Sequence, residues 1–344
     1  MKALKYFSIL IVPIVIYISF IGEGWLSFTA PIFFYGFVPF LEFFIKPNKV
    51  NFTKEEEKIE KENKLYTYLL YATIPIQIVF LFYFLNTISD PSLTIIEISG
   101  RIFSMGIIST IIGINVGHEL GHRNNKLDEF LGGLLLLSTF NTHFLPYHNG
   151  GHHYNVATPN DAATAKKGEI LYFFWIRSHF QSYFQAWKIE NTRMKNDGKN
   201  WFSYQNKMVV YTFCNVLFLG LIFYFFGQFA LLAFIIASVI SIAQLETVNY
   251  IEHYGLLRKQ NKHGRYEKVK RNHSWNSDHQ VGQVLLFNLS RHSDHHYNGS
   301  KHYQLLKSVP ESPQMPTGYP GMMILSFFPP LWFWVMNKKI QKLT

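Results

Sequence analysis

The sequence predicts an all-α polytopic membrane protein with about six transmembrane helices and a histidine-rich catalytic portion on the cytoplasmic side. Two observations lead to this class. Six stretches of roughly 20 residues contain at most two charged residues each, and four histidine clusters fall at or between their ends. A helix needs about 20 apolar residues to cross the hydrocarbon core of a bilayer. The length of 344 residues suggests a soluble two-domain protein, but the distribution of charge overrules that prior.

The six stretches are expected to be helices, because a single segment in lipid must satisfy its own backbone polar groups. Pro13 and Pro75 are expected to kink their helices without breaking them. The first stretch also resembles a secretory signal peptide, but the next apolar run follows almost at once, which favours a retained span. The predicted spans lie near 6–21, 25–45, 66–86, 92–117, 208–226 and 229–249.

Lysine and arginine predict the orientation of these spans. The links at 22–24, 87–91 and 227–228 contain neither residue, and apart from Arg101 all basic residues fall on the opposite side. Cytoplasmic segments carry the excess of Lys and Arg. We therefore expect a multi-pass protein of the inner (cytoplasmic) membrane, with both termini and the histidine clusters in the cytoplasm.

The whole chain is expected to form one integral-membrane domain, residues 1–344, with cytoplasmic segments at 118–207 and 250–344. Two short apolar stretches, 130–140 and 322–335, cannot span. We expect both to lie against or dip into the membrane. The alternative is that they form small cores in the cytoplasmic segments.

Composition excludes two classes of protein. The net charge of +10 lies in short segments beside apolar runs, as expected next to anionic lipid headgroups, so no nucleic-acid partner is expected. The only cysteine, Cys214, lies inside an apolar run and excludes an internal disulfide or a cysteine-held iron or zinc site. Any electrons that this protein uses must come from another molecule.

The histidine clusters carry the chemistry. Residues three or four apart share a face of a helix, and the clusters "GHELGH", "YHNGGHH" and "RHSDHH" each contain such a pair. Imidazole is the commonest protein ligand for metals. A fourth cluster, "NYIEHYG", holds one histidine just beyond the sixth span. The candidate metal ligands are His118, His122, His148, His152, His153, His253, His292, His295 and His296.

Nine ligands exceed what one metal takes, so two metals are implied. Imidazole ligation alone does not choose among iron, zinc and copper. Carboxylates are expected behind the ligands, where they accept imidazole N–H bonds and fix the tautomers. The candidates are Glu119, Asp161, Glu252, Asp278 and Asp294. No catalytic residue beyond the metal ligands is predicted.

Several motifs resemble a known family in order and spacing. They are "HELGHR", "HNGGHH" followed by "VATPNDAATA", "NYIEHYGLLR", "HSWNSDH" and "SRHSDHH", and "MPTGYPG" is similar to the family's C-terminal segment. Together they resemble the membrane-bound alkane 1-monooxygenases, over nearly the whole chain. Tyr147 and Ser290 depart from the usual glutamate and glutamine of that pattern, so the surroundings of the ligands differ there.

The resemblance implies a non-haem di-iron site held by the nine histidines, with O2 as co-substrate. It implies insertion of one oxygen atom into the terminal methyl group of an n-alkane taken from the bilayer. Electrons would come from a separate rubredoxin and its reductase. We expect that donor to dock on a basic surface made by Arg258, Lys259, Lys268, Lys270 and Arg271.

A terminal methyl group must reach the metals end-on, which calls for a narrow apolar channel between the spans. Phe34, about three turns above the boundary at Lys46, is our candidate for its closed end. Two rival functions remain. A membrane fatty-acid desaturase or another histidine-box hydroxylase would use similar clusters. A metal transporter would instead place its ligands within the spans, near the membrane midplane.

Overall fold

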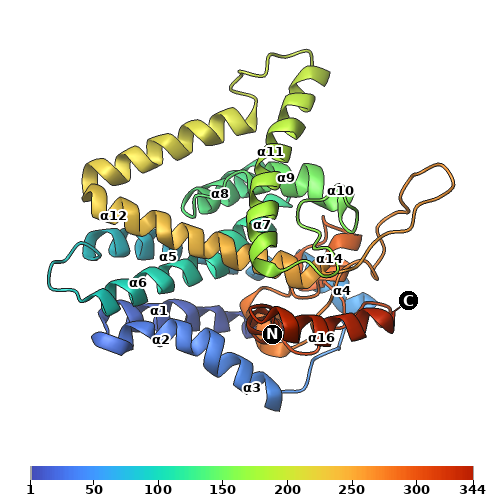
Figure 1. Ribbon diagram of the computed structural model, residues 1–344, viewed down its shortest axis with the longest axis horizontal. Coiled ribbons are helices and arrows are strands. Elements are labelled where there is room, and N and C mark those ends of the chain that lie inside the picture. The colour runs from blue at the N-terminus through green and yellow to red at the C-terminus, as the bar shows by residue number, and fades with distance from the viewer. Residues whose placement is uncertain (1, 344) are drawn as a thin grey trace. The chain divides into compact units, whose positions relative to one another are not determined.

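The computed structural model describes residues 2–343, and the regular structure in that part of the chain is helical (Figure 1). Its only extended pairings are two isolated bridges between single residues. The chain divides into two compact units. Unit 1 comprises residues 2–36, 65–147 and 183–245, and unit 2 comprises residues 37–64, 148–182 and 246–343. The all-helical class is confirmed.

Five helical segments are long and apolar enough to cross a membrane. The first joins η1 (Lys2–Leu10) to α1 (Ile11–Ile21). The second runs through η2 (Gly24–Phe28), α2 (Thr29–Ile32), η3 (Phe33–Phe37) and α3 (Val38–Phe44). The third is α5 (Leu65–Thr87), the fourth runs through α6 (Ile95–Ile108), η4 (Ser109–Ile114) and α7 (Asn115–Gly121), and the fifth is α12 (Lys207–His253).

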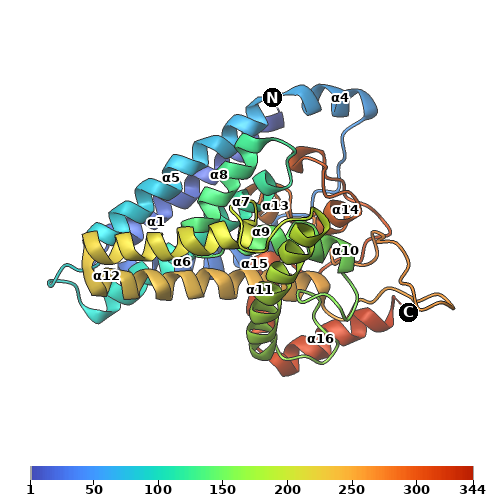
Figure 2. The ribbon, with the colours of Figure 1, turned by 90° about the horizontal axis from the view of Figure 1, so that it is seen from above.

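Helix α12 contains the fifth and sixth predicted spans. At 1.5 Å per residue its 47 residues would extend for about 70 Å, more than twice the thickness of a bilayer core. Gly227, with φ 82° and ψ 177°, leaves the helical conformation at the predicted link. Figures 1 and 2 show the chain turning back sharply there, so α12 is two helical arms. About six spans is therefore the count that the structure supports.

The spans are less regular than the sequence led us to expect. The second and fourth each contain a π-helical turn, at Phe33–Phe37 and Ser109–Ile114. A third π-turn, η5 (His148–His152), coincides with a histidine cluster. Such turns insert a residue into a helix and are frequent at functional sites. Apolar periodicity does not reveal them, because they leave the composition of the segment unchanged.

In unit 1, glycines bring α7 and α8 (Lys126–Leu137) into close contact. A Cβ on Gly132 would lie 2.9 Å from the carbonyl oxygen of Gly117, which is too close for any side chain. A Cβ on the adjacent Gly133 would meet only Tyr211, with the hydroxyl at 3.5 Å and a ring carbon at 3.8 Å, both ordinary contacts. The first short apolar stretch therefore buries one face against α7, while Phe130 on the other face is exposed. Its contact with lipid stays a prediction.

The second short apolar stretch forms two helices, α15 (Tyr319–Ser326) and α16 (Pro329–Gln341). The Pro329–Pro330 pair starts α16, as expected for residues that cannot continue a preceding helix. Trp332 is fully buried, whereas Trp334 is 60% exposed.

The remaining helices are α9 (Phe144–Tyr147) in unit 1, α11 (Leu171–Asn196), which passes from unit 2 into unit 1, and α4 (Lys54–Glu62), α10 (His153–Asn155), α13 (Gln280–Leu285), α14 (His292–Tyr297) and η6 (Tyr303–Leu305) in unit 2.

Arg291 anchors the start of α14, the helix with three predicted ligands. Its side chain is buried, and its guanidinium donates to the carbonyl oxygens of Leu306 at 2.7 Å, Asn48 at 3.0 Å and Val50 at 3.1 Å. Asp278 lies 3.4 Å from the Arg291 Nε. This buried network fixes the segment after α3 and the residue that follows η6 to the N-terminus of α14. The orientation of α14 is thereby fixed.

Candidate metal centre

Unit 2 brings four of the predicted ligands together. His152, His253, His292 and His296 are buried, and one ring nitrogen of each lies within 4.8 Å of the others. The Nε2 atoms of His152 and His296 are 3.1 Å apart, as are those of His253 and His292. With a metal–nitrogen distance of about 2.0 Å, neighbouring ligand atoms lie roughly 3 Å apart. The group is therefore close to the arrangement of four ligands around one metal ion.

Three further histidines form a second group in unit 2. The Nε2 atoms of His148 and His153 are 3.0 Å apart, and the ring centroid of His295 lies 4.9 Å from that of His153. Their ligand atoms all lie within 4.8 Å of one another. Three convergent imidazoles can hold a metal and leave positions for other ligands.

Two local structures distribute the histidines between the groups. Helix α14 turns His292 and His296 toward the first group and His295 toward the second. The π-turn η5 does the same for the other cluster, because its i→i+5 hydrogen bonds bring residues five apart onto one side. His148 and His153 are thus paired, and His152 is left to face the first group. An α-helical spacing alone would have paired His148 with His152.

The last two predicted ligands lie in unit 1. His118 is in α7 and His122 follows it, and their Nε2 atoms are 2.8 Å apart. The helix carrying them is the one that packs against α8 through Gly117 and Gly132. This packing holds the pair in an arrangement that two ligands of one metal would adopt.

Two of the five candidate carboxylates contact a histidine of the first group. Asp161, which is 2% exposed, accepts a hydrogen bond from His152 Nδ1 at 2.9 Å and another from the Thr164 hydroxyl at 2.6 Å. It therefore directs the His152 Nε2 toward the other ligands. Glu252 is different, because its Oε2 lies 3.2 Å from His292 Nε2, the nitrogen that faces His253. Its position is that of an additional donor to a metal.

The other three carboxylates have different partners. Glu119 lies 3.4 Å from Arg123, which donates at 3.0 Å to the Thr67 hydroxyl. Asp278 contacts Arg291 and accepts from the Ser308 hydroxyl at 2.6 Å. We expected Asp278 to accept an imidazole N–H bond, and the structure corrects that expectation. The spacing in the sequence placed it near the ligands but did not specify its partner.

Asp294 also departs from expectation. Although it lies between two ligands in sequence, its carboxylate points away from them, to Arg271 at 3.0 Å and Lys301 at 2.6 Å. Its Oδ2 accepts a further bond from the Lys307 backbone N–H at 2.9 Å. Burial would raise the pKa of Asp294, but these partners outweigh it and lower the pKa, so the group is ionised. A helix directs neighbouring residues to different faces, which explains the outcome.

Burial keeps two imidazoles of α14, those of His295 and His296, in their ligand form. The pKa values of His295 and His296 are well below the usual range, first because of burial and then because other histidines surround them. Neutral imidazole has the lone pair that a metal ligand needs.

Two residues at the site were missed by reasoning from the sequence. The Tyr319 hydroxyl donates to Glu252 Oε1 at 2.6 Å, and the Ser274 hydroxyl lies 3.4 Å from His253 Nδ1. Tyr319 comes from "MPTGYPG" and Ser274 from "HSWNSDH", motifs that were recognised only as part of the family pattern. No spacing rule connects either of them with a partner so far away in the chain.

Comparison with known proteins identifies the family. Residues 98–326 match the family model described as fatty acid desaturase. The alkane 1-monooxygenase 1 of Alcanivorax borkumensis is 36% identical over 90% of this chain and 77% of its own length. Alkane 1-monooxygenase 2 of the same species is 33% identical over 99% and 92%, and the alkane 1-monooxygenase of Pseudomonas putida is 36% identical over 92% and 79%.

The chain belongs to the alkane 1-monooxygenase family. As a member of that family it is a multi-pass membrane protein and a monooxygenase enzyme. The desaturase match covers the region that contains all nine histidines, and the named relatives place the chain among the alkane 1-monooxygenases. The histidine groups are compatible with the metal site of such an enzyme.

Proposed function

We propose that this protein hydroxylates the terminal methyl group of n-alkanes to give 1-alkanols, with O2 and electrons from rubredoxin. The observation that carries the proposal is the pair of convergent imidazole groups in unit 2, of which the first is buried throughout. We propose two non-haem iron ions as the cofactor. The ligands are the seven histidines of those groups together with His118 and His122, which stand in the family motif "HELGHR".

Bound iron would supply the activation of O2, a chemistry for which no side chain has the electrons. Zinc has no redox chemistry and does not serve this reaction. The residues of the chain would hold the iron ions and orient the ligands. Asp161 fixes the ring of His152, and Tyr319 holds one oxygen of Glu252 so that the other faces His292. The burial of all four histidines of the first group excludes bulk water from the reacting centre.

The substrate and the orientation follow from the membrane setting. An n-alkane dissolves in the bilayer and would enter between spans, with its chain toward Phe34 and its terminal methyl toward the metals. Phe34 is 5% exposed, so its ring is buried and does not face lipid. The basic segments favour a cytoplasmic active site and two cytoplasmic termini in the inner membrane. A C-terminal fusion to alkaline phosphatase should be inactive, and the same fusion after residue 227 should be active.

The test of the function combines metal analysis with product identification. Purified protein should contain two irons per chain, and zinc alone would refute the proposal. Membranes supplied with rubredoxin, its reductase, a nicotinamide cofactor and alkanes of graded length should form 1-alkanols. An alkene or an unsaturated fatty acid as the product would instead favour a desaturase. Loss of activity on chelation, with recovery on adding Fe²⁺ but not Zn²⁺, would identify the metal.

A further inference from the structure

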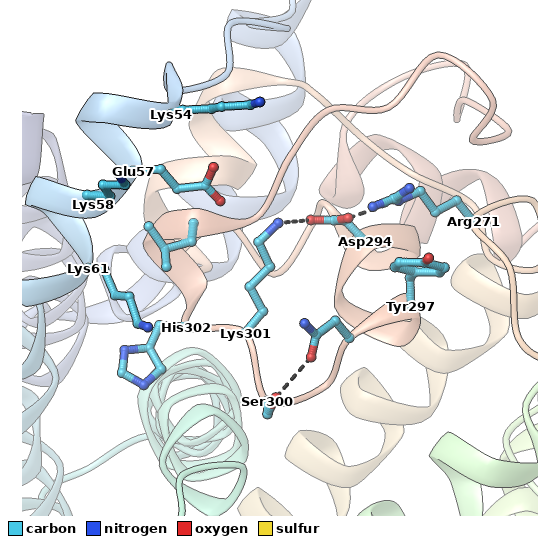
Figure 3. Close-up of a pocket in the computed structure, with 12 residues that line it drawn as sticks. Lys54, Glu57, Lys58, Lys61, Arg271, Asp294, Tyr297, Ser300, Lys301 and His302 are labelled. Carbon is cyan, nitrogen blue, oxygen red and sulfur yellow. Dashed lines mark hydrogen bonds and ion pairs between the residues drawn. The ribbon is translucent and has the colours of Figure 1, made fainter.

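A basic hollow lies beside the helix that carries three of the proposed ligands. It has a volume of about 650 Å³ and lies in unit 2, with α4 on one side and α14 with its following loop on the other (Figure 3). Five lysine and arginine side chains line it, against two carboxylates. The lining residues used below are Lys54, Glu57, Lys58, Lys61, Arg271, Asp294 and Lys301.

Both carboxylates of the hollow are already neutralised. Figure 3 shows Asp294 between Arg271 and Lys301, with dashed contacts to both. Glu57 accepts a hydrogen bond from Lys307 Nζ at 2.7 Å. Neither acid is therefore available to balance the lysines of α4.

The lysines of α4 gather on one face. Lys54, Lys58 and Lys61 follow i, i+4 and i+7 spacing, and all three are exposed. None has a carboxylate within ion-pair distance among residues 2–343. The helix as a whole carries five glutamates, but only Glu57 lines the hollow. The structure thus separates the charges of an acidic helix and leaves three uncompensated cations at the hollow.

The position of the hollow relates it to electron supply. Asp294 lies on α14 between His292 and His295, so an object in the hollow is directly against the ligand-bearing helix. The given sequence has one cysteine, too few to hold an iron–sulfur electron carrier, so the electrons must come from another molecule. We propose that the hollow is the docking site of the electron donor, and that the donor presents a cluster of carboxylates to the three lysines. This inference rests on the proposed function.

Part of the surface that the sequence suggested for docking is already paired within the chain. Lys270 pairs with Glu267, and Arg271 is held by Asp294. Arg258 donates to backbone carbonyl oxygens, at 3.1 Å to Glu267 and 2.7 Å to Tyr154. Lys259 and Lys268 are exposed and have no carboxylate within ion-pair distance among residues 2–343. Charge alone therefore does not separate the two surfaces, and the position of the hollow against α14 is what favours α4.

The experiment compares two charge reversals of equal size. One variant carries Lys54→Glu, Lys58→Glu and Lys61→Glu. The control carries Lys259→Glu, Lys262→Glu and Arg265→Glu, three exposed residues of the 258–271 region. Each is assayed with rubredoxin as donor, for the apparent KM of rubredoxin and kcat. Each variant is also reduced chemically with dithionite and exposed once to O2 and octane. This single turnover needs no docking of rubredoxin. Binding of oxidised rubredoxin is measured separately by calorimetry.

Reversal on α4 should raise the KM and Kd for rubredoxin about tenfold or more, the size expected for losing three exposed charge pairs. The yield of the chemically reduced turnover should not change, and the control should shift either constant less than threefold. An unchanged Kd in the α4 variant, or an equal shift in the control, would overturn the proposal. The proposal would also be overturned if the wild-type protein bound inorganic pyrophosphate but not rubredoxin. If neither the wild type nor any variant forms octanol after chemical reduction, the proposed hydroxylase function is wrong. The calorimetry would still test the docking site, because binding of rubredoxin does not depend on turnover.

Discussion

Replacing Asp161 by asparagine should loosen one metal and leave the other. The substitution keeps the shape of a 2% exposed side chain but removes the charge that accepts from His152 Nδ1 at 2.9 Å. In the wild type the Thr164 hydroxyl donates to Asp161 at 2.6 Å, to the same oxygen that accepts from His152. In the variant either an NH₂ group or a single neutral oxygen would face both donors. Loss of such a carboxylate partner weakens metal binding by roughly 10–100-fold, or about 1.4 to 2.8 kcal/mol.

The assay is competition with a chelator, followed through iron content in detergent solution. Wild-type protein should lose two irons at similar chelator concentrations, whereas Asp161→Asn should lose one iron at a concentration 10–100-fold lower. Asp197→Asn serves as the control, because that carboxylate is 44% exposed and its ion-pair partners are Arg193 and Lys199. Equal loosening of both irons, or none, would refute the assignment of His152 to a separate four-histidine group.

Three other predictions follow from burial and packing. His253→Ala should abolish hydroxylation and halve the iron content, because this side chain is fully buried in the four-histidine group. His263→Ala should change neither, because its side chain is exposed. Activity retained in His253→Ala would remove His253 from the ligand set. Phe34→Ala should extend the longest alkane accepted without slowing octane, and an unchanged chain-length profile in folded, iron-loaded protein would place the channel end elsewhere. Gly132→Ala should lower stability by about 1 to 3 kcal/mol through overpacking against α7. The adjacent Gly133→Ala should be neutral or stabilising, and equal melting temperatures for the two variants would contradict the close contact.

The sequence by itself determined the membrane class and the ligand set that we propose. Lipid excludes charge and unsatisfied backbone, so spans leave a pattern that needs no tertiary information. The link at Gly227 was placed in this way, even though the helix assignment runs through it. The histidines of α14 were also accessible, because i, i+3 and i+4 positions meet by the geometry of one helix.

The tertiary structure decided which partners the polar groups have. The π-turn paired His148 with His153, Glu252 came to face the metal side of His292, and Asp294 turned to Arg271. The lysines of α4 became a basic face although the helix is acidic in composition. Each of these depends on a contact between distant segments or on a local departure from α-helical geometry. Periodicity records which residues share a face of one regular helix, and it carries no information on what that face will meet.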